Sequence, residues 1–247
     1  MEKQTGRQTI NNDFYEELSE GWYTASDHPI ALLRAENRVR VPWIIGEIGR
    51  NKTVLDVGCG AGILANALSL AGHQVFAIDL SVSSLEAAQK HDVTHRVAYQ
   101  IANAYSLPYP DSSFDVVCAM DVLEHVEEPN LLISEASRVL KPGGLFFFHT
   151  FNRNVLSYFL IIKGVEWCVP NTPKNMHIYP LFIKPGELKE MCAEKDLEIV
   201  QLRGFTPEIF SRPFWKMVTQ RKVPPDFTFR FSKNLATGYC GYAKKLT

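Results

Sequence analysis

A short apolar run followed by three alternating glycines constrains the fold of this chain more than any other feature. The run and its first glycine read TVLDVG at 53–58, and Gly60 and Gly62 follow before a helix-forming segment begins at residue 63. Glycines let the backbone turn sharply and leave room for a ligand to lie against it. This order predicts a buried parallel strand whose carboxyl end carries a ligand-binding loop. A tight strand-to-helix turn without a ligand is the alternative.

Strand and helix patterns continue to alternate along the chain. Buried strands are predicted at 53–58, 74–79, 97–102, 114–120 and 144–150, and helices at 63–70, 83–90, 129–140 and 184–194. Residues 11–50 are predicted to be helical with a break at His28-Pro29, and two last strands are predicted at 197–205 and 236–245, with an irregular segment over 206–234 between them. Such alternation implies crossover connections and a parallel sheet, which is the α/β class.

Two acidic residues indicate which ligand the glycine loop binds. Asp79 lies 19 residues beyond Gly60, at the end of the second strand, where a carboxylate accepts hydrogen bonds from ribose hydroxyls. The dinucleotide pattern G-x-G-x-x-G would require glycine at position 63, which is Ile63 here. Asp56 would repel a diphosphate but attract a cofactor that carries an ammonium and a sulfonium. The sequence therefore favours S-adenosylmethionine over NAD.

Charge and cysteine content narrow the class of partner and the location. The formal net charge is −1, so there is no basic field that would attract nucleic acid, and no nucleic-acid partner is expected. The five cysteines are scattered and none forms a CxxC pair, which argues against a zinc site and a disulfide scaffold. A cytoplasmic location is expected from this cysteine usage.

A series of motifs resembles a known family. VLDVGCGAG, AIDLS, LPYPDSSFDVV, LEHVEEP and LKPGG are similar, in this order over 53–145, to class I S-adenosylmethionine-dependent methyltransferases. NRVRVPWI, MDVLEHV, FNRN and KGVEW…FIKPGEL resemble the ubiquinone-biosynthesis O-methyltransferases, which methylate polyprenylated catechols. The resemblance implies a Rossmann-like fold with a seven-stranded, mostly parallel sheet, an antiparallel last strand and helices on both faces. We expect one domain over 1–247, with a helical N-terminal cover (1–50), a cofactor-binding core (51–150) and acceptor-side elements (151–247).

The resemblance also implies an activity and a set of cofactor contacts. It implies methylation of a phenol or catechol oxygen on a small aromatic acceptor related to quinone precursors. Methylation of an oxygen or nitrogen on another small metabolite, and cofactor binding without catalysis, are the alternatives. By position it implies contacts from Arg40 (cofactor carboxylate), Gly58 and Gly60 (methionine part), Asp79 (ribose), Asn103 and Ala104 (adenine) and Met120 (adenine pocket). This chain departs from the family at Ile178, where an acidic residue is usual, and after Gly204.

A polar cluster follows the fourth predicted strand. Asp121, Glu124 and His125 would share one face of a helix, at the edge of the sheet where α/β proteins bind ligands. They are the predicted catalytic residues, with His125 as the first candidate for a proton acceptor. The resemblance implies that the same three residues could hold Mg²⁺. A D-x-x-E capping box is the structural alternative. His149 and His177 are noted without an assigned role.

The apolar segment VLSYFLIIKGVEWCV occupies 155–169. Lys163, Gly164 and Glu166 interrupt it, and a membrane-spanning helix needs about 20 predominantly apolar residues. The segment is predicted to be an amphipathic cover of the substrate site or a peripheral membrane contact, with Phe159, Ile162 and Trp167 on the apolar side. A helix buried on the domain core is the alternative.

Overall fold

A computed structural model describes residues 9–247, so the first eight residues of the predicted N-terminal cover lie outside the described part. The helices are α1 (Phe14–Leu18), α2 (Gly21–Thr24), α3 (Ile30–Ile48), α4 (Ile63–Leu70), α5 (Val82–Lys90), α6 (Pro129–Val139), α7 (Val155–Ser157), α8 (Gly164–Cys168), α9 (Pro185–Ala193) and α10 (Arg212–Gln220), with 3₁₀ turns η1 (Leu123–His125) and η3 (Tyr179–Leu181) and a π-helical stretch η2 (Tyr158–Lys163). The strands are β1 (Thr53–Val57), β2 (Gln74–Asp79), β3 (Ala98–Ile101), β4 (Phe114–Met120), β5 (Leu140–Phe151), β6 (Leu197–Pro207), β7 (Phe229–Ser232) and β8 (Gly238–Lys245).

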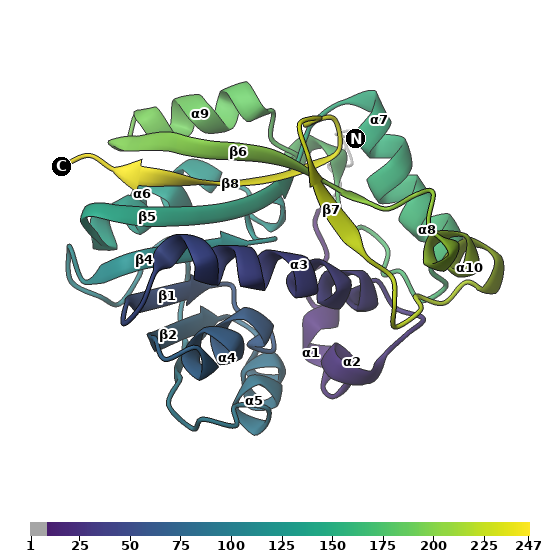
Figure 1. Cartoon of the computed structure of the whole chain (residues 1–247), viewed down its shortest axis with the longest axis horizontal. Helices are drawn as coiled ribbons and strands as arrows, with labels where there is room; N and C mark the ends of the chain where they lie inside the picture. Colours follow the sequence, from purple (N-terminus) through teal and green to yellow (C-terminus); the bar gives the residue numbers. More distant parts are fainter. Residues whose placement is uncertain (1–8) are drawn as a thin grey trace, which may run out of the picture.

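The eight strands within residues 9–247 form one sheet, in the order β3-β2-β1-β4-β5-β8-β6-β7 (Figure 1). The strands β1 to β5 pair in parallel, and β8 lies between β5 and β6, antiparallel to both. This confirms the α/β class and the mostly parallel sheet with an antiparallel last strand. Alternate residues of each central strand face opposite sides, as the pleat of a strand requires.

The predicted strand number was wrong by one, because the segment 206–234 is not irregular. Residues 227–231 read FTFRF, an alternating aromatic pattern, and β7 pairs with the free edge of β6. α10 also lies in this segment, and the Ser211 hydroxyl caps it by accepting a hydrogen bond from the Phe214 N–H at 3.3 Å. The neighbouring Pro, Asp and basic residues masked both elements, since they weaken the local strand and helix signals.

Two apolar cores cover the two faces of the sheet. On one face, Leu55, Val117 and Phe146 pack with α6 and α9. On the other, Val54 and Phe147 pack with α3 and α4. The continuous apolar sequences of β1, β4 and β5 follow from this arrangement, because a central parallel strand is buried on both faces.

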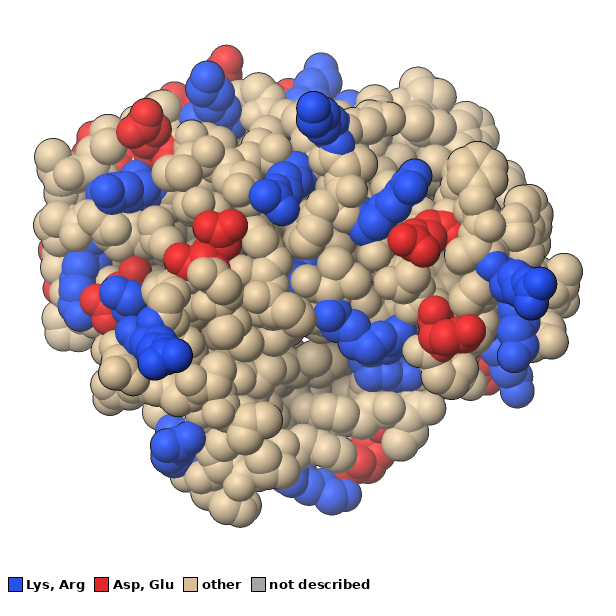
Figure 2. All heavy atoms as spheres, in the orientation of Figure 1, with Lys and Arg blue, Asp and Glu red and all other residues tan. Residues whose placement is uncertain are grey.

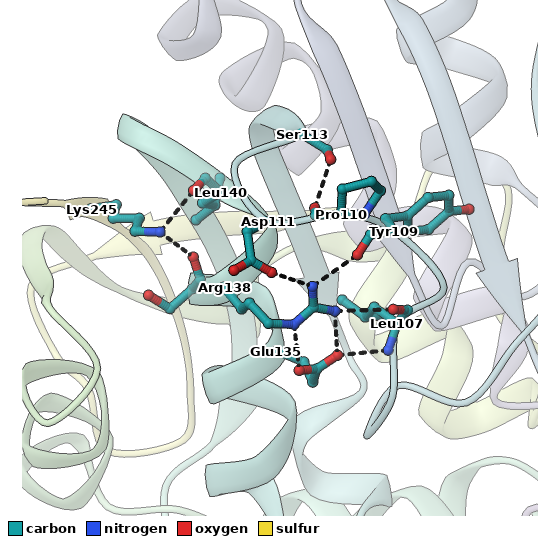
Figure 3. Close-up of polar contacts among 10 residues, drawn as sticks. Leu107, Tyr109, Pro110, Asp111, Ser113, Glu135, Arg138, Leu140 and Lys245 are labelled. Atoms are coloured by element: carbon teal, nitrogen blue, oxygen red, sulfur yellow. Dashed lines mark hydrogen bonds and ion pairs between the residues drawn. The ribbon is translucent and has the colours of Figure 1, made fainter.

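Arg138 on α6 fixes the loop that leads from β3 to β4 (Figure 3). Its guanidinium donates to the Tyr109 carbonyl at 2.8 Å and to the Leu107 carbonyl at 3.0 Å. Glu135 holds the same guanidinium from α6 and accepts a hydrogen bond from the Leu107 N–H at 2.7 Å. These contacts anchor the chain just beyond the residues predicted to flank an adenine ring.

The N-terminal helices α1 and α2 cover the amino end of α5. Glu16 accepts hydrogen bonds from the Val82 and Ser83 N–H groups at 2.8 and 3.1 Å, which satisfies two free donors of the first helical turn. The Trp22 indole donates to the Ser84 hydroxyl at 3.1 Å. The predicted helical cover is therefore present (Figure 1), and its Trp22 ring lies against Gly60 of the glycine loop.

Candidate active site

The loop between β1 and α4 can be built only with glycine at its key positions. Gly58 and Gly60 have φ angles of 67° and 51°, in the left-handed region that other residues rarely adopt. A Cβ atom on Gly58 would lie 2.4 Å from the Val122 side chain, and one on Gly60 would lie 2.5 Å from the Trp22 ring. The loop is thus pressed between the end of β4 and the N-terminal cover.

Two carboxylates flank this loop, the buried Asp56 and the partly buried Asp79, and they differ in their hydrogen-bond partners. Each oxygen of Asp79 accepts one backbone hydrogen bond, from the Gly60 N–H at 2.8 Å and from the Ser81 N–H at 2.9 Å. Asp56 Oδ2 is buried and has no hydrogen-bond partner among residues 9–247. Burial, aided by the negative charge of Asp79, raises the pKa of Asp56 to about 8. A cationic ligand beside Asp56 would relieve this cost, because an opposite charge favours the ionised carboxylate.

One cavity of about 950 Å³ extends from the glycine loop to the segment 155–169, α10 and β7. Ten of the predicted site residues line it, namely Asp56, Gly58, Gly60, Asp79, Asn103, Ala104, Met120, Asp121, Glu124 and His125. Its other end is apolar and is lined by residues of the segment 155–169 and of α10 and β7, among them Phe159, Trp167, Phe214 and Phe229.

Arg40 is held in a buried ion cluster and does not line this cavity. Its guanidinium donates to both oxygens of Asp121, at 2.8 and 2.5 Å, and lies 3.3 Å from Glu36 Oε2. His149 also bonds to Asp121, through Nδ1. Arg40 and His149 hold the pKa of Asp121 well below its usual range, against the opposing effect of burial. The predicted contact between Arg40 and the cofactor carboxylate remains a prediction.

The backbone after β4 does not form the helix that would place Asp121, Glu124 and His125 on one face. Asp121 has a φ of 59°, in the left-handed region, and only a single 3₁₀ turn, η1, follows. The capping-box alternative was wrong, because the Asp121 carboxylate bonds to Arg40 and His149 rather than to a helix N-terminus. A strained residue fixed by several partners is typical of functional sites.

The three predicted catalytic residues fall into two separate clusters. Candidate ligand atoms of Glu124, His125 and His177 lie within 4.8 Å of one another, while Asp121 groups with Glu36 and His149. Both oxygens of Glu124 are buried without a hydrogen-bond partner in the described part of the chain, and burial raises the pKa of Glu124 well above its usual value. Burial lowers the pKa of His125 to about 4, so its imidazole is neutral at neutral pH.

The sequence did not assign several residues that the fold brings to this site. His177 lies beside His125 with ring centroids 5.1 Å apart, and Tyr15 meets His125 edge-on at 5.9 Å. Asn12 bonds to His125 from 113 residues away. No local pattern could reveal these contacts, since they depend on how the N-terminal cover and the loop around His177 fold back onto η1.

The segment 155–169 partly matches its predicted amphipathic character. Phe159 and Trp167 are 51% and 65% exposed, whereas Ile162 is buried against Phe151 and Phe182. The predicted position of Ile162 on the surface-facing apolar side was therefore wrong. Within residues 9–247, no helix has the length and apolar content needed to cross a bilayer.

Comparison with known proteins identifies relatives of this chain. A family model described as a methyltransferase domain matches residues 55–148. The ubiquinone biosynthesis O-methyltransferases of Thiobacillus denitrificans and of an Azoarcus species are 39% and 37% identical over 197 residues, and both matches cover 78% of this chain and 84% of the relative. A solved S-adenosylmethionine-dependent methyltransferase from Thermotoga maritima has a TM-score of 0.64 at 18% identity, covering 94% of this chain and 99% of that one.

The sheet order, the glycine loop and these matches together define a class I S-adenosylmethionine-dependent methyltransferase. S-Adenosylmethionine is accordingly the methyl donor that the class uses. More narrowly, the chain belongs to the ubiquinone biosynthesis O-methyltransferase family.

Proposed function

We propose that this protein methylates a hydroxyl oxygen of a phenol or catechol that resembles a quinone precursor and carries an apolar substituent. The observation that carries the proposal is the continuous cavity, which is polar beside Asp79 and the glycine loop and apolar beneath the segment 155–169 and α10. A small polar metabolite would leave the apolar end empty. The relatives are named for ubiquinone biosynthesis, which points to the same acceptor class.

The residues around the glycine loop fit the proposed cofactor. S-Adenosylmethionine supplies an activated methyl group and carries ammonium and sulfonium charges. Asp56 has a buried oxygen to which none of the described residues is hydrogen-bonded, which suits a positive group. Asp79 is held by two backbone N–H groups, and its remaining lone pairs can accept the ribose hydroxyls. We also propose that the N-terminal cover and the elements after residue 150 close this site as parts of a single domain.

His125 is proposed to remove the acceptor proton. A phenol has a pKa of about 10 and is mostly protonated at neutral pH, so the oxygen must lose its proton as the methyl group is transferred. The neutral imidazole of His125 has one nitrogen free to accept that proton. The negative charge of Asp121 favours the imidazolium that forms. Glu124, whose pKa is raised well above its usual value by burial, can hydrogen-bond a second hydroxyl of a catechol.

The arrangement does not fit Mg²⁺ at Asp121, Glu124 and His125. Both oxygens of Asp121 are engaged by Arg40, and one also by His149. The donors that converge are one carboxylate and two imidazoles, those of Glu124, His125 and His177. Mg²⁺ prefers oxygen ligands in octahedral geometry. No step of the proposed reaction is therefore assigned to a cation.

Methyl transfer to a panel of acceptors tests the proposed function. The purified protein is incubated with S-adenosylmethionine and with catechols, phenols or amines, with and without an apolar side chain, and the products are analysed by mass spectrometry. We expect a mass gain of one CH₂ on catechols, with a lower KM when an apolar chain is present. Methylation of amines alone would support the other-metabolite alternative, and cofactor binding without any product would support a non-catalytic role.

Replacing Asp79 with Ala should weaken S-adenosylmethionine binding by about 1.5–3 kcal/mol, the scale of a hydrogen bond to a charged group. Calorimetric titration measures the dissociation constant, and the melting temperature verifies folding. Asp226→Ala is the matched control, because Asp226 is exposed and lies outside the cavity lining. An unchanged dissociation constant in folded Asp79→Ala would mean that other residues hold the ribose.

The mouth of the apolar end is also the proposed site of peripheral membrane contact. Phe159 and Trp167 are exposed, as are Phe210, just before α10, and Trp215, on α10, at 88% and 58%. α10 contacts α8, which carries Trp167. Lys and Arg side chains lie at the edge of the molecule where Figure 1 places α8 and α10 (Figure 2). Exposed aromatic rings beside basic residues suit the headgroup region of an anionic membrane.

Liposome flotation tests this contact. We expect the wild-type protein to float with anionic vesicles, less so at high salt because the charge attraction is screened. The double variant Trp167→Glu/Phe210→Glu should remain folded and stay at the bottom of the gradient. Leu70→Glu/Val93→Glu is the matched control, since Leu70 and Val93 are 68% and 74% exposed and lie outside the cavity lining. Wild-type protein that never floats would contradict the contact and favour an interior cover.

A further inference from the structure

Asn12, just before α1, makes a two-point contact with His125. Its amide nitrogen donates to the backbone carbonyl of His125 at 3.2 Å. Its amide oxygen lies 3.2 Å from Nδ1 of the same imidazole. Both bonds join residues 113 positions apart and are partly buried.

These two bonds determine which imidazole nitrogen carries the proton. A backbone carbonyl only accepts hydrogen bonds, so the NH₂ end of the amide must face it. The amide oxygen, which also only accepts, then faces Nδ1, and the bond forms only if Nδ1 is protonated. A neutral imidazole has one N–H, so Nε2 retains its lone pair.

We propose that Asn12 is a positioning residue that fixes His125 as the Nδ1–H tautomer and so keeps the Nε2 lone pair available to the acceptor hydroxyl. This inference rests on the proposed role of His125 in methyl transfer. The opposite tautomer would present an N–H at Nε2, which cannot accept a proton. The rings of Tyr15 and His177, at 5.9 and 5.1 Å, limit rotation of the imidazole.

The contact also links His125 to the position of the N-terminal cover. Asn11 places the segment by donating from its side chain to the Lys174 carbonyl at 3.2 Å and from its backbone N–H to the Asn175 carbonyl at 3.0 Å. The segment 174–175 precedes His177 in the chain. Asn11 and Asn12 therefore join the N-terminal cover both to this loop and to His125.

NMR spectroscopy can measure the His125 tautomer directly. In protein with ¹⁵N-labelled histidine, NMR correlations from the ring protons to the two ring nitrogens distinguish the Nδ1–H and Nε2–H forms. His125→Gln identifies the His125 signals among the seven histidines. We expect a single Nδ1–H form in the wild type and a mixture of tautomers in Asn12→Ala. Asn12→Asp, which still offers an acceptor oxygen, should retain the Nδ1–H form.

Kinetics provide the second readout. Asn12→Ala should lower kcat about tenfold, the scale of one lost hydrogen bond, while its dissociation constant for S-adenosylmethionine stays within about twofold. Asn12→Asp should recover most of kcat. Asn11→Ala is the matched control, because it keeps the backbone N–H bond from residue 11 to the Asn175 carbonyl and removes a side chain that does not contact His125.

Several results would overturn the inference. They are an Nε2–H tautomer in the wild type, an unchanged tautomer in Asn12→Ala, or an equal loss of kcat in Asn11→Ala. Absence of methyl transfer in the wild type would instead contradict the proposed function, and the tautomer measurement would stand without it. If Asn12→Ala does not fold, the wild-type spectrum and Asn12→Asp decide the question.

Discussion

Replacing Arg40 with Met should lower the free energy of unfolding by about 3–5 kcal/mol, which is the usual effect of removing one partner of a buried ion pair. The Arg40 side chain is fully buried, and its removal leaves Asp121 and Glu36 close together without a compensating cation. Denaturant titration at neutral pH measures the change. The same variant tests the implied cofactor contact, because a direct bond from Arg40 to the cofactor carboxylate would also weaken S-adenosylmethionine binding.

Arg38→Met is the matched control on the same helix. Arg38 is exposed and bonds to the Phe227 carbonyl rather than to a carboxylate, so its loss should change stability by less than about 1.5 kcal/mol. Adding Asp121→Asn to Arg40→Met should recover part of the lost stability, since the isolated charge is then removed. Equal effects of Arg40→Met and Arg38→Met would contradict the importance of the buried cluster.

Replacing His125 with Gln should lower kcat by about 10²–10⁴-fold, the range for loss of a general base. Gln cannot accept the proton, but it is polar and similar in length, so cofactor affinity and melting temperature should change little. Steady-state kinetics with an acceptor from the panel measure the effect. The same assays are run with added Mg²⁺ and with a chelator. If the wild-type protein requires metal and His125→Gln does not respond to it, the predicted magnesium site would be supported.

His95→Gln controls for the chemical change, since His95 is exposed and lies outside the cavity lining. It should keep the wild-type kcat. Should His125→Gln retain activity within about threefold, proton removal would not depend on His125, and Glu124 would become the next residue to test, because its two buried oxygens face the same cluster.

The cofactor half of the molecule could be predicted from sequence because its signals are local. Apolar runs of strand length, the spacing of the three glycines and the position of Asp79 each report on a few neighbouring residues. β1, β2 and β4 accordingly lie where the pattern places them. The sheet order then follows from crossover connections, which have few alternatives.

The acceptor half was predicted less completely because its contacts join distant parts of the chain. Arg40 and Asp121 are 81 residues apart, and the bond between them separates Asp121 from Glu124 and His125, with which the sequence grouped it. The spacing of Asp121, Glu124 and His125 suggested one helical face, but a left-handed residue and a single 3₁₀ turn replace that helix. Periodicity describes residues within one helix or strand. It cannot indicate which distant residue a side chain will bond to in the folded protein.

The position of β8 in the sheet has a consequence for biosynthesis. β8 follows β6 and β7 in the chain but lies between β5 and β6. As the chain leaves the ribosome, β1 to β5 can pair in order, whereas β6 and β7 emerge with no strand to join them to β5. Until β8 inserts, the edges of β5 and β6 with which it will pair remain unpaired and can bind other chains. We therefore expect the nascent protein to depend on chaperones most strongly in the interval before its last strand emerges.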